Sequence, residues 1–259
     1  MSWLRIDDEG PVRVVTLDRP ERKNAIPVTG WAELEGVFRD FEGSDARVLI
    51  VTGSGGDFCA GADLDESRLG ETPPVPERYT RMKTVGAAAT ALHRLTKPTI
   101  AAVDGVAVGA GMNLALGCDV VVCTDRARFS EIFVRRGLAL DFGGSWLLPR
   151  IVGLQRAKEL ALSGRIVEAA EAVEIGLALD AVEPDRLMDR AMEMAQSFLQ
   201  GAPLAQGFVK QQLNASFESS FSESIGWESE SQTITLGTED AREGVASFLE
   251  KRPPTWHGR

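Results

Sequence analysis

The segment Lys97-Pro-Thr-Ile-Ala-Ala-Val-Asp-Gly-Val-Ala-Val-Gly-Ala-Gly-Met-Asn113 decides the fold of this chain. Its residues 99–103 form a short apolar run behind a proline, which predicts a buried β-strand. The glycine-rich residues 104–113 lead from that strand into residues 109–117, whose small apolar side chains predict a close-packed helix. Such a turn presents backbone N–H groups that have no partner within the helix.

The sequence on both sides of this segment extends the pattern. Residues 12–18, 48–52 and 120–123 predict further strands, and residues 3–7 pair with 12–18 across a turn at Glu9-Gly10-Pro11. Helical stripes lie between the strands, at Trp31, Leu34, Phe38 and Phe41 and at Tyr79, Met82, Val85, Ala89, Leu92 and Leu95. The second half predicts helices at residues 154–163, 168–175, 185–200, 203–217 and 238–249. Strands that alternate with helices predict an α/β fold with a parallel sheet.

Composition narrows the class of protein. The 259 residues are 44% hydrophobic and 25% charged, which is typical of a globular protein. A net charge of −10 argues against a nucleic-acid partner. The longest uncharged run, residues 194–209, contains polar residues, glycine and proline and therefore predicts no membrane span. Three scattered cysteines and two distant histidines predict a reduced, cytoplasmic protein without a metal site.

A second glycine-rich segment, Phe58-Cys-Ala-Gly-Ala-Asp-Leu64, follows the strand at 48–52 and its loop. If its N–H groups and those of residues 109–111 converge, they form an oxyanion hole. The alternative is that these glycines only permit close packing. A dinucleotide-binding fingerprint is broken at Leu114, and a phosphate-binding P-loop fails at Asp57.

Several motifs in their order along the chain resemble the crotonase, or enoyl-CoA hydratase/isomerase, superfamily. They are Thr16-Leu-Asp-Arg-Pro-Glu-Arg-Lys-Asn-Ala25, residues 48–53 with 57–64, residues 97–111, Cys118-Asp119, Phe142-Gly-Gly-Ser-Trp-Leu-Leu-Pro-Arg150, residues 239–244 and residues 248–253. The resemblance covers nearly the whole chain. It implies a crotonase-like ββα spiral core over residues 1–195 and a helical C-terminal trimerisation region over 196–259, as one structural unit. It also implies homotrimers or hexamers made of two trimers.

The resemblance implies a CoA-thioester substrate and no cofactor other than the CoA of that substrate. The thioester oxygen is expected between the backbone N–H groups of Ala62 and Ala110. The substrate-binding positions that it implies are Lys23, Ala25, Ala60, Asp63, Leu64, Val106, Val108, Gly109, Phe133 and Leu140. Arg22, Lys210, Lys251 and Arg252 are candidates for phosphate contacts, with solvated surface charges as the alternative. A helix cap is the favoured role for Asp63.

The chain departs from the family's hydratase pattern at both catalytic glutamates. Asn113 and Phe133 hold those positions, and neither exchanges a proton at neutral pH. Hydration by two glutamates is therefore doubtful. Asp141 resembles the aspartate of dienoyl-CoA isomerases and of ring-epoxide isomerases, with a helix N-cap as its alternative role. Glu131 is expected to be an exposed loop acid.

These residues favour an enoyl-CoA isomerase-like enzyme. Asp141 would move protons on the acyl chain while Ala62 and Ala110 hold an enolate, with Asn113 completing the catalytic set. Apolar side chains would keep water from the acyl pocket, namely Phe129, Phe133, Leu138 and Leu140. Arg135 and Arg136 are surface charges, or partners of a carboxylated substrate. The alternatives are a hydratase, hydrolase or decarboxylase that uses Glu131, Asn113 or bound water, and an acyl-CoA-binding protein without activity.

Overall fold

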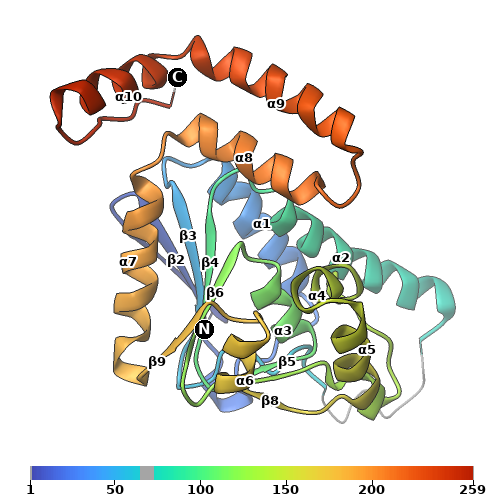
Figure 1. The fold of residues 1–259 in the computed structure, drawn as a ribbon. Coiled ribbons are helices and arrows are strands. Elements are labelled where there is room, and N and C mark those ends of the chain that lie inside the picture. Colours follow the sequence, from blue (N-terminus) through green and yellow to red (C-terminus); the bar gives the residue numbers. More distant parts are fainter. Residues whose placement is uncertain (1, 65–72, 259) are drawn as a thin grey trace.

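Six strands form the main sheet of the computed structural model, which describes residues 2–64 and 73–258 (Figure 1). The strand order is β1-β2-β3-β4-β6-β9; β1 is antiparallel to β2, and all other neighbours are parallel. The strands are β1 (Leu4–Glu9), β2 (Val12–Leu17), β3 (Val48–Gly53), β4 (Thr99–Val103), β6 (Val120–Thr124) and β9 (Asp180–Val182). The predicted hairpin and parallel sheet are confirmed.

A second, three-stranded sheet lies beside the first. It contains β5 (Val106–Val108), β7 (Arg128–Ser130) and β8 (Val167–Glu168), of which β5 and β7 are parallel. These strands are too short for their hydrophobic pattern to predict them. An isolated bridge between Cys59 and Ala107 joins this sheet to the loop that follows β3.

Helices cover both faces of the main sheet, because successive residues of a buried strand point to opposite sides. One face packs against α7 (Leu187–Leu199), whose Ala191 lies among the valines and isoleucines of β2, β3, β4 and β6. The other face packs against α1 (Gly30–Gly43), through Phe38, and against α3 (Ala110–Leu116). This second face supports the candidate site.

The remaining helices surround that face. α2 (Val75–His93) packs against α1, and α4 (Gly144–Val152) packs against α3 and α5 (Leu154–Ser163). α6 is Ala169–Glu174, and the short helices η1, η3 and η4 are Pro20–Arg22, Ile132–Arg136 and Pro184–Arg186. The stripe predicted for α2 is buried only in its C-terminal half, since Tyr79 and Met82 are exposed.

Three C-terminal helices form a layer above the core (Figure 1). They are α8 (Pro203–Ala215), α9 (Phe221–Leu236) and α10 (Glu239–Glu250). The chain end returns to the α7–α8 junction, where Trp256 Nε1 donates to the Gln200 carbonyl at 2.7 Å. The boundary expected at residue 195 lies inside α7. No helix in the described ranges is long and apolar enough to cross a membrane.

Candidate active site

Two glycine turns meet on the α3 side of the main sheet. Cys59 N donates to Val106 O at 2.8 Å, and Val108 N donates to Cys59 O at 3.0 Å. A Cβ on Gly61 would lie 2.8 Å from Val108 O and 3.5 Å from Ala110 N, and one on Gly111 would lie 2.3 Å from Cys59 O. The two backbones are therefore in direct contact, and close packing is part of the reason for these glycines.

Ala62 and Ala110 keep unbonded N–H groups where these turns meet. On the first turn, Gly61 O accepts from Ile26 N at 2.8 Å, and Asp63 N donates to Ile26 O at 2.9 Å. Ala110 begins α3 after Gly109, whose φ of 56° suits glycine. Among the described residues, the N–H groups of Ala62 and Ala110 have no hydrogen-bond acceptor. This is the arrangement expected of an oxyanion hole, in which both donors remain available to a ligand.

A basic turn lies beside the first of these donors. Lys23 N donates to Pro20 O, Lys23 O accepts from Ala60 N at 2.9 Å, and the exposed Lys23 Nζ lies 3.3 Å from the Asp57 carboxylate. The Asp63 carboxylate pairs with Arg19 at 3.0 Å and with Arg22 at 3.5 Å. The segment that Asp63 was expected to cap continues into residues 65–72, outside the described residues, so this role stays a prediction.

Arg19 is a site residue that the sequence analysis missed. Its guanidinium binds the Asp63 carboxylate and also donates to the Ala25 carbonyl at 2.9 Å. It thereby joins the basic turn to the segment that carries Ala62. Arg19 lies in the motif Asp18-Arg-Pro-Glu, which the sequence analysis quoted. An arginine in a polar turn is expected to be solvated unless its partner, here Asp63, is known from the structure.

Three of the remaining phosphate candidates have other surroundings. Lys210 Nζ is bonded to Asp119 at 2.7 Å and to the Lys97 carbonyl at 2.9 Å, with only 11% of its side chain exposed. Arg252 is paired with Glu243 at 2.6 Å, while Lys251 is exposed at the end of α10. The interpretation of Lys210 as a solvated surface cation is therefore wrong, because Asp119 and the core cover it, whereas Arg252 is an exposed surface cation that pairs with Glu243.

Asn113 joins the two acids of the site. Its side chain is fully buried on α3, and Nδ2 donates to the Asp141 backbone carbonyl at 3.0 Å and to Glu131 Oε2 at 3.4 Å. A Cβ added to Gly144 at the start of α4 would lie 2.4 Å from this Nδ2. The amide is therefore fixed on one side by α4 and on the other by the two acidic residues.

The expectation that Glu131 is exposed is wrong, since only 1% of its surface is accessible. Glu131 lies two residues beyond Phe129, on the same side of an extended segment, and Phe129 is fully buried. The preceding Ser130 binds the Gly164 carbonyl through Oγ at 3.0 Å, which holds the segment against α5 and β8. Glu131 therefore enters the interior with Phe129.

Asp141 is partly buried just before α4 and does not cap that helix. The N-cap residue of α4 is Gly143, and no side chain caps it. Phe142 and Gly143 both have left-handed backbones, with φ of 48° and 82°, and the buried Phe142 ring packs 5.7 Å from the Trp31 ring centroid. Strain of this kind at a non-glycine residue is often found at functional sites. These two left-handed residues separate Asp141 from the start of α4, so its carboxyl does not cap that helix.

The two acids have separated pKa values. Burial raises the pKa of Asp141 to about 6. Burial also raises the pKa of Glu131 to about 8, against the lowering effect of the Asn113 amide and with a further increase from the Asp141 charge. Among the described residues, Asn113 Oδ1, Glu131 Oε1 and Asp141 Oδ1 are buried without a hydrogen-bond partner. At neutral pH the site therefore holds an ionised Asp141 beside a protonated Glu131.

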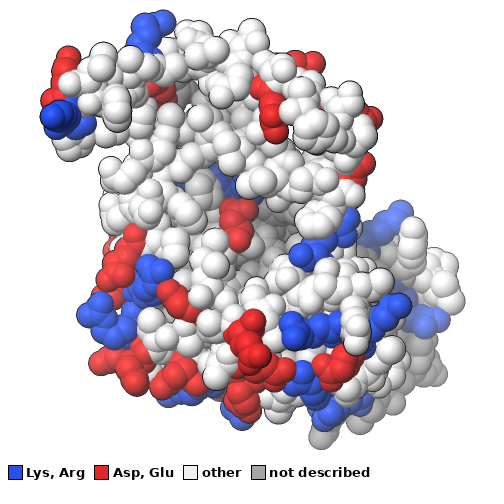
Figure 2. All heavy atoms as spheres, viewed as in Figure 1, with Lys and Arg blue, Asp and Glu red and all other residues white. Residues whose placement is uncertain are grey.

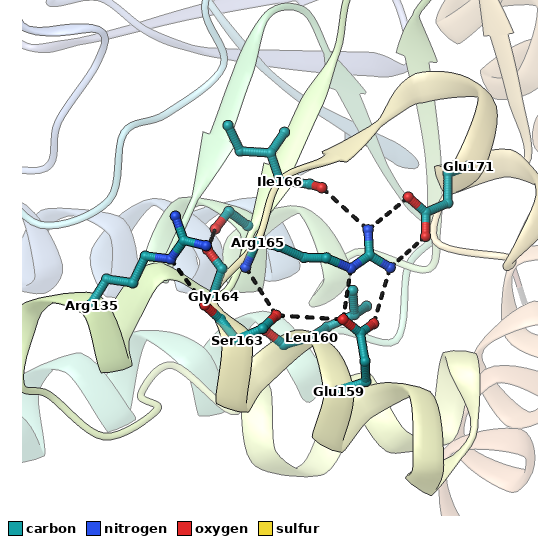
Figure 3. Close-up of polar contacts among 9 residues, drawn as sticks. Arg135, Glu159, Leu160, Ser163, Gly164, Arg165, Ile166 and Glu171 are labelled. Atoms are coloured by element: carbon teal, nitrogen blue, oxygen red, sulfur yellow. Dashed lines mark hydrogen bonds and ion pairs between the residues drawn. The ribbon is translucent and has the colours of Figure 1, made fainter.

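Phe133 closes the site near the second donor. A Cβ on Gly109 would lie 3.5 Å from Phe133 Cζ. Leu140, Val106 and Val108 are partly buried, whereas Leu64 and Leu138 are largely exposed. Leu138 is therefore not buried with Phe129 and Phe133, and its place in the expected apolar wall stays a prediction. Arg135 is exposed and donates to the Ser163 carbonyl at 2.9 Å (Figure 3), and Arg136 is exposed too.

Three kinds of comparison relate this chain to known proteins. The family model described as enoyl-CoA hydratase/isomerase matches residues 7–259. The chain is 36% identical to the 1,2-epoxyphenylacetyl-CoA isomerase of Escherichia coli K12 over 261 aligned positions, which cover 100% of both chains. It is 35% identical to the short-chain-enoyl-CoA hydratase of Clostridium acetobutylicum, over 95% of this chain and 94% of that one. A putative enoyl-CoA hydratase structure from Streptomyces coelicolor A3(2) has a TM-score of 0.94 at 34% identity, covering 100% of this chain and 95% of that one.

Proposed function

The chain belongs to the enoyl-CoA hydratase/isomerase family, as an enzyme that acts on CoA thioesters, and from this premise we propose that it is an isomerase with Asp141 as acid and base. One observation carries the proposal. Asp141 supplies a partly buried carboxyl whose Oδ1 has no hydrogen-bond partner in the described ranges, while Asn113 and Phe133 hold the positions where the hydratase pattern has glutamates. The relative named 1,2-epoxyphenylacetyl-CoA isomerase lends it support.

The reaction begins with the thioester oxygen between the N–H groups of Ala62 and Ala110. Asp141 removes a proton from one carbon of the acyl chain, and the electron pair of that C–H bond passes into an enolate or dienolate. The two N–H groups stabilise the negative charge on oxygen, where each donor contributes about 10²–10³ in rate. Asp141 then returns the proton to another carbon, which moves the double bond and regenerates the carboxylate.

The protonation state of Asp141 suits these reaction steps. A base works best when its pKa lies near the operating pH, and burial raises the pKa of Asp141 to about 6. Phe133 limits access of water beside Gly109, which disfavours hydration. Lys23 and Arg22, on the basic turn, are the cations that we assign to the phosphates of CoA.

A second candidate function rests on Glu131. Water addition requires a second carboxyl, and Glu131 is a buried acid joined to Asn113. Relatives named short-chain-enoyl-CoA hydratase and carnitinyl-CoA dehydratase support water addition or removal as the alternative reaction. Because Glu131 is 1% exposed, it reaches a substrate only if the segment after β7 moves. Isomerisation, which needs one accessible carboxyl, therefore fits better.

We also propose that the protein assembles as a homotrimer, or as two trimers in a hexamer, through residues 196–259. Large apolar side chains stay exposed on this region, among them Phe217, Phe221, Leu236, Phe248 and Leu249. Figure 2 shows long uncharged stretches over the C-terminal helices, whereas the lower part of the same view carries many charged side chains. Exposed apolar surface of this extent is typical of an interface. A cytoplasmic location remains a prediction from the sequence.

The variant Asp141→Asn tests the proposed function. We expect isomerisation of 2-enoyl- and 3-enoyl-CoA esters to fall by about 10²–10⁴-fold, while the dissociation constant of the ester stays the same. Asp185→Asn, at an exposed aspartate of η4, is the matched control. If Asp141→Asn turns over the esters as fast as the wild type, Asp141 is not the acid and base.

A further inference from the structure

We propose that Glu131 is a second carboxyl of this site, a positioning residue that acts on Asp141 through the Asn113 amide and must stay uncharged for turnover. This inference rests on the proposed function of Asp141. Glu131 is not one of the two glutamates of the hydratase pattern, because Asn113 and Phe133 hold those two positions in this chain. Glu131 instead enters from the end of β7 and lies behind Asn113.

The contact geometry connects the two acids through one amide. Asn113 Nδ2 donates to Glu131 Oε2 at 3.4 Å and to the Asp141 carbonyl at 3.0 Å. The Asp141 carbonyl also accepts from Gly144 N at 3.0 Å, so the backbone of Asp141 is held from two sides. A change of charge at Glu131 alters the first of these contacts and, through the shared amide, the position of Asp141.

Within the described ranges, no cation pairs with Glu131 to compensate a charge. Asp141, from the loop before α4, is the charged group that acts on it, and α3 contributes only the neutral Asn113. On η3, which begins at the residue after Glu131, Arg135 is exposed and donates to the Ser163 carbonyl. From the α5–β8 side, Arg165 is held between Glu159 and Glu171 (Figure 3). Among the described residues, no lysine, arginine or histidine forms an ion pair with Glu131.

An uncharged Glu131 follows from this environment. A carboxylate that is only 1% exposed, with one long amide hydrogen bond and a second carboxylate acting on it, is unfavourable, so the proton is retained. The pKa of Glu131 is raised to about 8, whereas that of Asp141 is raised to about 6. Between these values Asp141 is ionised and Glu131 is neutral. Above pH 8, Glu131 also loses its proton. Its negative charge then disfavours the negatively charged enolate and disturbs the hydrogen bonds of Asn113.

The first test is the pH dependence of kcat/KM for the wild type and Glu131→Gln, measured with the enoyl-CoA ester that the wild type isomerises. Glutamine keeps the shape of the neutral acid but cannot ionise. We expect wild-type kcat/KM to fall by about tenfold per pH unit above pH 8, and this alkaline fall to be absent in Glu131→Gln, which keeps the acidic limb. Glu183→Gln, at an exposed glutamate, is the matched control and keeps both limbs.

Two results overturn the inference. One is an alkaline fall in Glu131→Gln that equals the wild-type fall. The other is a loss of activity by the same factor at every pH, which indicates a merely structural role. Thermal unfolding of each variant at pH 7 shows whether the fold is kept, and Glu131→Asp provides a second ionisable variant that retains an alkaline limb.

The second test does not depend on turnover. The infrared carbonyl stretch of a protonated carboxyl is recorded as a difference between the wild type and Glu131→Gln. We expect a protonated-carboxyl band from the wild type at pH 7 that disappears as the pH is raised through 8. If the band is absent at pH 7, the inference fails even when Asp141 is catalytic. If the band titrates but no enoyl-CoA ester reacts, the proposed function fails and the protonated state of Glu131 stands.

Discussion

Asp141 and Glu131 have raised pKa values because both carboxyls are removed from water, and no cation in the described part of the chain pairs with either of them. A raised pKa in the folded state means that the folded protein binds protons more tightly than the unfolded chain. The stabilisation that Glu131 contributes is therefore complete below its ordinary pKa of 4.5 and is lost as the pH rises through about 8. For Asp141 the corresponding window runs from 3.8 to about 6.

The direction of this pH dependence gives a prediction for the stability of Glu131→Gln. Relative to the wild type, the variant gains free energy of unfolding as the pH rises from 5 to 9, because glutamine has no proton to lose. Urea unfolding at pH 5, 7 and 9 measures the difference, and each kcal/mol moves the thermal midpoint by about 2–4 °C for a chain of this size. A difference that stays constant over this range contradicts the raised pKa.

Gly144 gives a second test of the Asn113 amide. A Cβ at this position would lie 2.4–2.7 Å from the amide atoms of Asn113, so Gly144→Ala must displace them. We expect kcat to fall on the order of 10²-fold, because a shift of about 1 Å in a positioned group has this effect. Gly86→Ala is the matched control in α2, where an added Cβ meets nothing within 4 Å.

The control variant carries its own expectation. Gly86→Ala keeps wild-type kcat and gains about 0.5–1 kcal/mol of stability, because alanine favours the helix interior. Equal kcat in the wild type, Gly144→Ala and Gly86→Ala contradicts a role for the Asn113 position.

Sequence reasoning at the residue scale found the positions but not the contacts. Ala62, Ala110 and Asp141 follow from motifs, and the structure brings their segments to the α3 side of the sheet. Glu131 and Lys210 were misjudged, because a charged residue is expected at the surface unless a partner far along the chain is known. The partners of Glu131 and Lys210 that decide burial, Asn113 and Asp119, lie 18 and 91 residues away.

At the scale of elements, α8 is attached to the core by the ammonium of Lys210. Nζ binds Asp119 Oδ2 at 2.7 Å, and the same oxygen accepts from Thr99 N at 2.7 Å and Thr99 Oγ1 at 2.8 Å. The pair connects α8 to the start of β4 and the end of α3. Because its ammonium is bonded to Asp119 and to the Lys97 carbonyl, we expect Lys210 to have a structural role.

Lys210→Met is therefore expected to reduce stability and to leave CoA-ester binding unchanged. Methionine keeps the length of the side chain but leaves Asp119 without its cation, and the loss of such a charged hydrogen bond is about 1–3 kcal/mol. The free energy of unfolding and KM measure the two effects separately. Unchanged stability with a raised KM would instead support the phosphate contact considered from the sequence.

The longer elements with a buried apolar face were predictable from the sequence. β3, β4 and β6 contain short continuous apolar runs, β2 is buried at every residue although Arg13 and Thr16 interrupt its apolar pattern, and α1 buries the predicted Trp31, Leu34, Phe38 and Phe41. α9 was missed, since this helix, described along its whole length, buries none of its side chains. A helix without an inward stripe gives no periodic signal in one chain.

At the scale of the whole molecule, the exposed side chains of α8, α9 and α10 predict an assembly. We expect light scattering to give a mass of three or six chains. Phe248→Asp, at a side chain that is 81% exposed, is expected to weaken association at least about tenfold, the equivalent of 1.4 kcal/mol. Ile6→Asp on the edge strand β1 is the control. A wild-type protein that stays monomeric at high concentration contradicts the proposed trimer.

The central claim is that Asp141 moves protons on the acyl chain of a CoA thioester through an enolate. The most direct measurement is mass spectrometry of 2-enoyl- and 3-enoyl-CoA esters incubated in D₂O with the wild type and with Asp141→Asn. The wild type is predicted to introduce deuterium into the acyl chain without adding water, and Asp141→Asn is predicted to introduce almost none. Addition of water by the wild type, or equal deuterium uptake with Asp141→Asn, would contradict the claim.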